Sequence, residues 1–273
     1  MDSYTDFASV YDTFMDETPY AQWADYISQL IAKYGISQPM GKTRTEEKTE
    51  ENSAQALRSE ENLVVELGCG TGTFTEAMAA RGYDMIGIDN APEMLNIASG
   101  KRERSGIPIM YLEQDMRELD LYSTAGTFVS VCDSVNYLTE DEDVLQMMKL
   151  VNNYLYPQGI FIFDFNTVHK YRDVIGDATI AENREDCSFI WENYYHEEEA
   201  VNEDDLTIFR KTENGLFERS VETHYQRGYT LPQMQAFVEK SGMKFITAVD
   251  ADTHEAVTDD SERIYVIARE QGK

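Results

Sequence analysis

Short apolar runs alternate with helical patterns between residues 63 and 166. The runs cover 63–67, 85–89, 109–115, 128–133 and 160–165, and apolar positions recur every three or four residues in 73–82, 92–101 and 142–156. Such runs are typical of buried strands, and the longer spacing is typical of amphipathic helices. Strands and helices that alternate with short connections predict a parallel sheet with helices on both faces.

The C-terminal part of the chain completes this pattern. A helix is predicted over 231–242, followed by strands over 245–251 and 263–270. The expected fold class is therefore α/β, doubly wound and Rossmann-like, with a mostly parallel sheet of seven strands.

Residues 167–229 interrupt the alternation. The segments 187–195, 206–211 and 216–225 are rich in β-branched and aromatic residues, and Asn214-Gly215 between the last two favours a hairpin. Phe217, Val221 and Tyr225 alternate with polar residues, so we expect an antiparallel sheet whose polar face contacts solvent.

Several boundaries follow from local signals. Thr18 and Pro19 are expected to begin a helix that Gly35 ends in a left-handed conformation. Capping boxes are expected at Thr139 with Glu142 and at Thr230 with Gln233. Gly159 is expected to end the helix that the first of these boxes begins.

Four segments are expected to make up the chain. Residues 1–40 form an N-terminal helical segment over the cofactor site, and 41–61 form a disordered acidic insertion. Residues 62–166 and 230–273 form the core, and 167–229 form a β-rich lid. The alternative for 41–61 is an acidic recognition segment.

The net charge of the chain limits the classes of binding partner that we expect. The formal net charge is −28, and the densest basic cluster, Lys101, Arg102 and Arg104, lies where a helix should end. We therefore expect no nucleic acid and no membrane as partners, and a monomer or homodimer.

Cysteine and histidine spacing predicts neither a disulfide framework nor a metal site. The three cysteines are far apart, and the four histidines have no ligand spacing. The N-terminal residues lack an export pattern, and no apolar run approaches about 18 residues. We expect a cytoplasmic protein without a metal.

A glycine-rich turn follows the first predicted strand. Gly68, Gly70 and Gly72 give G-x-G-x-G, whereas a dinucleotide fingerprint would place a third glycine at Thr73. Glycines at the carboxyl end of a strand let a ligand approach the backbone, and the next helix offers free N–H groups.

The stretch ELGCGTG at 66–72 resembles the first motif of the class I S-adenosylmethionine-dependent methyltransferases, and later matches follow in order. The N-terminal YDTFMDETPYAQW, the stretch CDSVNYL and the β-rich insertion look like glycine and amino-sugar N-methyltransferases and an uncharacterised bacterial group. The resemblance implies S-adenosyl-L-methionine as cofactor and an insertion over the active site.

The resemblance and the chemistry of the side chains together predict the cofactor site. Asp89 is expected at the ribose hydroxyls, Asp115 and Met116 at the adenine, and Glu66 at the methionyl ammonium or the glycine turn. The full set is Tyr11, Glu66, Gly68, Cys69, Gly70, Asp89, Asn90, Met94, Asp115, Met116 and Cys132.

The acceptor side is less defined. The candidate substrate-binding residues are Asp133, Ser134, Asn136, Trp191, His224 and Arg227, and Tyr194 and Tyr195 accompany Trp191. Methyl transfer needs alignment more than acid–base help, so the catalytic residue stays open. The candidate bases are His224, Asp164 and Tyr11.

Three functions remain in competition. The first is methyl transfer from S-adenosylmethionine to a nitrogen or oxygen of a small-molecule acceptor. The second is a non-catalytic sensor that binds the same cofactor. The third is an NAD-dependent oxidoreductase, which Thr73 disfavours.

Overall fold

A seven-stranded sheet forms the centre of the protein. The computed structural model describes residues 7–40 and 59–273. The strand order is β10-β11-β5-β4-β1-β2-β3, in which β1 to β5 are parallel and β11 is antiparallel to both neighbours. The strands are β1 (Leu63–Leu67), β2 (Asp84–Asp89), β3 (Met110–Glu113), β4 (Ala125–Ser130), β5 (Leu155–Asn166), β10 (Lys244–Asp250) and β11 (Arg263–Arg269). The predicted fold class is confirmed.

Helices cover both faces of this sheet. They are α2 (Tyr20–Tyr34), α4 (Thr73–Ala80), α5 (Pro92–Ser105), α6 (Asp141–Tyr154) and α7 (Leu231–Lys240), while α1 (Ala8–Phe14) lies apart from these faces. Apolar residues of α2 and α4 pack on one face, and those of α6 and α7 pack on the other. Because β4 is buried along its whole length, the centre of the sheet excludes water from both sides.

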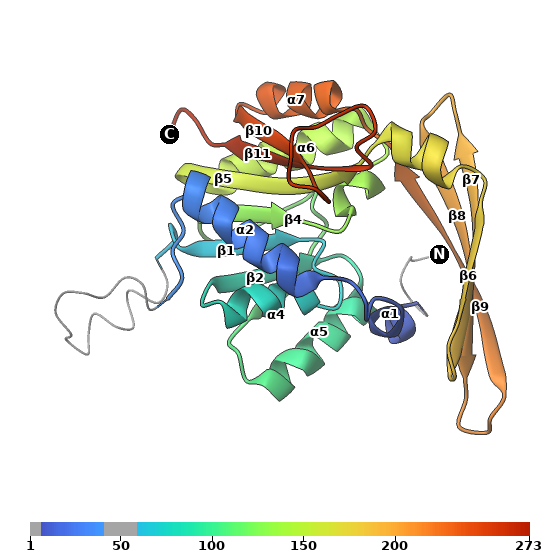
Figure 1. The fold of residues 1–273 in the computed structure, drawn as a ribbon. Coiled ribbons are helices and arrows are strands. Elements are labelled where there is room, and N and C mark those ends of the chain that lie inside the picture. The colour runs from blue at the N-terminus through green and yellow to red at the C-terminus, as the bar shows by residue number, and fades with distance from the viewer. Residues whose placement is uncertain (1–6, 41–58) are drawn as a thin grey trace.

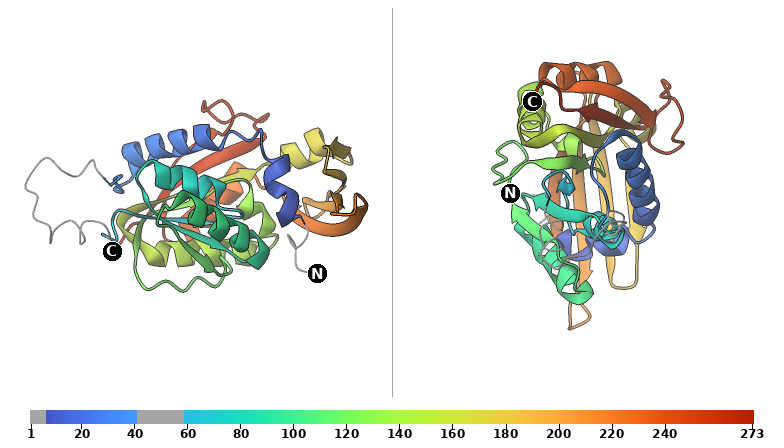
Figure 2. Two further views of the ribbon diagram at one scale, coloured as in Figure 1. Left: turned by 90° about the horizontal axis from the view of Figure 1, so that it is seen from below. Right: turned by 90° about the vertical axis from the view of Figure 1, so that its left-hand side faces the viewer.

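A second, four-stranded antiparallel sheet lies beyond the carboxyl ends of the parallel strands (Figures 1 and 2). Its strands are β6 (Thr179–Asn183), β7 (Cys187–His196), β8 (Val201–Lys211) and β9 (Phe217–Arg227), and the π-helical η2 (Lys170–Ile175) precedes them. Gly215 adopts a positive φ of 76° in the β8–β9 hairpin, as Asn214-Gly215 predicted. We call this sheet the lid sheet.

Helix α1 lies between the lid sheet and the core. Val10 packs with Leu206 and Ile208 of the lid sheet, while Ala8 packs with Met94 of α5. The N-terminal segment therefore touches both parts of the molecule.

The predicted orientation of the lid sheet is wrong. On β9 the apolar Phe217, Val221 and Tyr225 are 51, 39 and 49% exposed, whereas Glu222 and His224 are 8 and 4% exposed. The polar side chains face the core because they meet polar groups there, a long-range match that alternation along one strand does not encode.

Some boundary signals were also wrong. No side chain caps α2 or α6: Pro19 and Glu140 hold their N-cap positions, so Thr18 and Thr139 do not. Gly35 is extended rather than left-handed. Helix α6 ends at Tyr154 without Gly159, which lies within β5. The box of Thr230 with Gln233 on α7 is confirmed.

Most of the predicted insertion at 41–61 lies outside the described residues. Residues 60–62 form a turn. The carboxylate of Glu60 there accepts a hydrogen bond from the N–H of Thr124 at 3.2 Å. Within the part of the chain that is described, no helix is long and apolar enough to cross a membrane.

Candidate functional site

A cavity of about 560 Å³ opens at the carboxyl ends of β1, β2 and β4. The strand order reverses at β1, and open α/β sheets bind ligands at such a point. The volume suits a small organic ligand. All residues predicted for the cofactor line it: Tyr11, Glu66, Gly68, Cys69, Gly70, Asp89, Asn90, Met94, Asp115, Met116 and Cys132.

The glycine turn forms one wall of the cavity, and its backbone adopts positive φ angles that side chains disfavour. Gly68 has a φ of 70°, and a Cβ there would lie 2.4 Å from Oγ of Ser134. Gly70 has a φ of 52° and no atom within 4 Å of a would-be Cβ. The first glycine allows close packing, and the second leaves backbone facing open space.

Asp89 ties this turn to the end of β2. Its Oδ2 accepts a hydrogen bond from the N–H of Gly70 at 2.7 Å, and its Oδ1 accepts one from Ala91 at 2.9 Å. Burial raises the pKa of Asp89 despite these bonds. A carboxylate oxygen accepts more than one hydrogen bond, so ligand hydroxyls can still bind.

Glu66 is a buried acid in the wall of the cavity. Its Oε2 accepts a hydrogen bond from Thr75, and the side chain is 2% exposed. Burial, together with the negative charge of Asp89, raises the pKa of Glu66 to about 8. The position therefore favours a cationic ligand group that would restore the ionised form.

The opposite end of the cavity carries a different acid. Asp115 accepts hydrogen bonds from one edge of the Arg117 guanidinium, from Nε to Oδ1 at 3.0 Å and from Nη2 to Oδ2 at 2.6 Å, and this pair lowers the pKa of Asp115. Arg117 also contacts Asp143 at 2.9 Å. The carboxylate is thus held ionised and fixed beside Met116.

A strained turn after β4 separates the cavity from the lid sheet. Cys132 and Asp133 have φ values of 63° and 56°, a left-handed conformation that side chains disfavour. The strand therefore ends before the predicted 128–133 run does. Burial and neighbouring carboxylates raise the pKa of Cys132 to about 12, so its thiol is a neutral wall.

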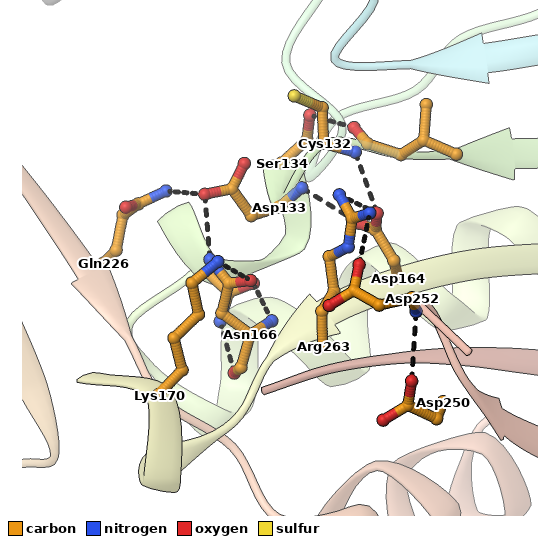
Figure 3. Close-up of polar contacts among 12 residues, drawn as sticks. Cys132, Asp133, Ser134, Asp164, Asn166, Lys170, Gln226, Asp250, Asp252 and Arg263 are labelled. Carbon is orange, nitrogen blue, oxygen red and sulfur yellow. Dashed lines mark hydrogen bonds and ion pairs between the residues drawn. The ribbon is translucent and has the colours of Figure 1, made fainter. Parts of the chain in front are cut away.

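Asp164 holds this turn in place (Figure 3). Its two oxygens accept the N–H groups of Cys132 and Asp133 at 3.0 and 2.9 Å, and Arg263 approaches at 3.7 Å. Asp164 is fully buried, and burial raises its pKa to about 6. Since both oxygens serve the backbone and the residue is absent from the cavity wall, the structure gives it a positioning role rather than that of a base.

The candidate substrate residues do not all share the cavity. Ser134 lines it. Asp133 accepts hydrogen bonds from Asn166 of β5 at 3.0 Å and Gln226 of β9 at 2.9 Å, which join core and lid sheet (Figure 3). Asn136 is buried and donates to the backbone oxygens of Asn166 and Arg227.

The other three lie on the lid sheet. Trp191 packs toward α1, and the guanidinium of Arg227 pairs with Asp141 at 2.7 Å, away from the cavity. His224 contacts Tyr137, which follows the strained turn in η1 (Ser134–Tyr137). Tyr194 lies on the outer face of the lid sheet and is 44% exposed.

Sequence reasoning missed several cavity residues. Tyr20 at the start of α2 and Tyr137 both line the cavity, together with Thr71 and Phe74 of the glycine turn and α4. Tyr137 lies in the stretch CDSVNYL, which was singled out, but no local signal separates it from a core tyrosine. Among the described residues no cluster of His, Cys, Asp and Glu could hold a metal ion.

Residues 64–159 match the family described as "Methyltransferase domain". The chain is 32% identical over 272 residues to the putative methyltransferase YqeM of Bacillus subtilis (strain 168), covering 97% of this chain and 96% of that protein.

Solved structures share the fold. An S-adenosylmethionine-dependent methyltransferase from Clostridium acetobutylicum ATCC 824 superposes with a TM-score of 0.81 at 22% identity, covering 99% of this chain and all of that one (100%). The S-adenosylmethionine-bound amino pentose methyltransferase CalS10 from Micromonospora echinaspora gives a TM-score of 0.66 at 16% identity, covering 99% of both chains. With its glycine turn, its acidic second strand and its near full-length relative, the chain belongs to the class I S-adenosylmethionine-dependent methyltransferases.

Proposed function

We propose that the protein methylates a nitrogen or oxygen atom of a small molecule, and that a nitrogen is the preferred acceptor. The carrying observation is the placement of the cavity at the reversal of strand order, between the glycine turn and α1. Tyr137 in its wall contacts His224 on the polar inner face of the lid sheet. A macromolecular substrate would have to reach past α1 and the lid sheet.

The cofactor residues have distinct proposed roles. Asp89 would hold the ribose hydroxyls, Asp115 with Met116 the adenine, and Glu66 the ammonium, while the amides near Gly70 face the carboxylate. The residues fit this group because the cavity combines an exposed backbone turn with three separate acids. When bound, the sulfonium supplies an electrophilic methyl group.

The chain's own contribution is alignment and exclusion of water. Tyr11 and Tyr20 bring aromatic surface from the N-terminal segment to the cavity, and Cys132 adds a neutral thiol. Held reactants gain several kcal/mol from proximity, on the order of 7–11 in the best cases. No strong acid is needed at this site.

Acidic groups between core and lid sheet support an amine acceptor. The acids there are Asp133, which is half-buried, and Asp204 and Glu222, which are buried. A cation, Lys170, also lies in this region and donates a hydrogen bond to Asn166. A protonated amine would be attracted to such a region. The amino pentose activity named for CalS10 is consistent with this choice.

Calorimetry with S-adenosylmethionine and S-adenosylhomocysteine tests the cofactor, and a mass-spectrometric screen tests the acceptor. The screen follows S-adenosylhomocysteine formed from a panel of amino sugars, amino acids, phenols, RNA, protein and fractions of a cell extract. Turnover of amines is expected. Binding without turnover of any extract fraction would instead support a sensor, and turnover of RNA or protein alone would overturn the small-molecule proposal.

A further inference from the structure

The inner face of the lid sheet buries polar groups while its outer face exposes apolar ones. Glu222 and His224 alternate along β9 with Val221 and Tyr225, and the first two are buried. Burying polar groups is unfavourable unless they are matched by partners. Tyr137 of the core is the partner of His224, and the N–H of Phe7 from the N-terminal segment is the partner of Glu222.

Two of these groups, Glu222 and His224, form a line with Tyr137 of η1 that ends at the cavity. The hydroxyl of Tyr137 lies 3.3 Å from Nδ1 of His224, and Nε2 of His224 lies 3.4 Å from Oε2 of Glu222. Tyr137 lines the cavity, whereas the side chains of His224 and Glu222 are 5 and 7% exposed. The other oxygen of Glu222 accepts the N–H of Phe7 at 3.0 Å, which fixes the carboxylate.

The charges around His224 set the direction of proton movement. Oε2 of Glu222 lies 3.4 Å from Nε2 of His224, a charge contact without hydrogen-bond geometry, and an ionised Glu222 favours a proton on that nitrogen by charge attraction. The lone pair of Nδ1 then faces the hydroxyl of Tyr137. Asp204 lies opposite His224 in the β8–β9 pairing, and burial raises its pKa to about 7.

We infer that Tyr137, His224 and Glu222 form a proton relay for the methyl acceptor, an inference that rests on the proposed function. The acceptor binds as an ammonium group and loses a proton to Oη of Tyr137 as the phenolic proton passes to Nδ1 of His224. The electrons of the broken N–H bond become the lone pair of the neutral amine, which forms the bond to the methyl carbon while the carbon–sulfur electron pair moves onto sulfur.

The residues have separate roles in this relay. Tyr137 is the catalytic residue, because it alone of the three lines the cavity. His224 and Glu222 act through it and are positioning residues. The imidazolium that forms at His224 is balanced by Glu222 on its own strand and by Asp204 on β8.

The first test measures the tautomer of His224 by NMR in the absence of any methyl acceptor. In protein labelled with ¹⁵N-histidine and saturated with S-adenosylhomocysteine, the chain's four histidines give few enough signals to resolve. His224 is expected as the Nε2–H tautomer, and the Tyr137→Phe variant should move its Nδ1 signal toward that of a free lone pair. A proton on Nδ1 in the wild-type protein would overturn the inference, because Tyr137 could not then donate to it.

The second test compares two histidines of the lid sheet. His224→Gln keeps an acceptor but cannot hold the proton; His196→Gln removes an exposed His–Glu pair, His196 with Glu203 at 2.8 Å, from the same sheet. With the amine found in the screen, His224→Gln should lower kcat at least tenfold at pH 7 and regain it at high pH, where the free amine is already neutral. His196→Gln should match the wild type.

The affinity for S-adenosylmethionine distinguishes failure of the proposed function from failure of the relay. Neither variant should change the Kd for S-adenosylmethionine more than about twofold, since neither histidine lines the cavity. If the wild-type chain fails to bind S-adenosylmethionine, the proposed function fails. If it binds and turns over while His224→Gln keeps the wild-type rate at pH 7, only the relay fails.

Discussion

Asp89 at the end of β2 accepts a hydrogen bond from the backbone N–H of Gly70 at 2.7 Å, and both residues line the cavity. One carboxylate therefore shapes the glycine turn and faces the ligand at once. Because the turn depends on this bond, loss of the charge acts on binding in two ways.

We expect Asp89→Asn to weaken S-adenosylmethionine binding at least tenfold, which corresponds to about 1.4 kcal/mol. The amide has one acceptor oxygen and cannot serve both the turn and a diol. Isothermal titration measures the change. Asp186→Asn, which removes an exposed pair with Lys211 of the lid sheet, is the matched control; equal affinities for the two variants would contradict the assignment of Asp89.

Glu66 should make stability depend on pH. Its pKa rises from 4.5 to about 8 on folding, so the folded chain binds more protons than the unfolded chain between these values. The free energy of unfolding is therefore full below about pH 4.5 and falls as the pH rises toward 8. Asp164 and Asp204, with pKa values raised to about 6 and about 7, act in the same direction at lower pH.

Urea denaturation at unit steps from about pH 5 to about pH 8 measures this slope, and Glu66→Gln should flatten it most between about pH 5.5 and about pH 7, where the folded chain holds the proton and the unfolded chain does not. An unchanged slope there would show that Glu66 is already ionised. S-adenosylmethionine, whose ammonium favours the carboxylate, should release a proton from Glu66 on binding. Calorimetry in phosphate and Tris buffers detects this release as a buffer-dependent heat.

Removal of the Asp164 side chain should be strongly destabilising. Asp164→Ala leaves two buried N–H groups of a left-handed turn and the Arg263 guanidinium without their acceptor. Breaking a buried pair in this way costs about 3–5 kcal/mol. Chemical denaturation measures the loss, and Asp25→Asn, at an exposed pair with Arg81, should leave the unfolding free energy unchanged.

The helix caps offer a paired comparison. Thr230→Ala removes a side chain that accepts from the N–H of Gln233 and should cost about 1 kcal/mol. Thr139→Ala removes a similar threonine that caps nothing, because Glu140 holds the N-cap of α6. Thermal unfolding should separate the two variants, and equal shifts would show that the box at α7 contributes little.

The parallel core and the cavity wall could be predicted from local patterns. The glycine turn, Asp89 and Asp115 all follow strand ends within a few residues, and parallel strands bring their carboxyl ends to one edge. These predictions used the order of elements along the chain together with the resemblance of the glycine turn to the first motif of the methyltransferases.

The acceptor side could not be predicted in the same way. His224 and Tyr137 are 87 residues apart and meet only when the lid sheet folds back on the core. The buried polar face of β9 reads as a surface face until its partners are known. Domain boundaries, oligomeric state and a cytoplasmic location stay predictions.

The lid sheet leaves and re-enters the core at adjacent points. Thr167 and Tyr229 form an isolated parallel bridge, and the N–H of Val168 donates to the oxygen of Tyr229 at 3.2 Å. The segment that contains β6–β9 is thus an insertion whose two ends lie side by side at one point of the core. Substitutions within β6–β9 can therefore alter this sheet without changing the path of the core strands that form the cavity.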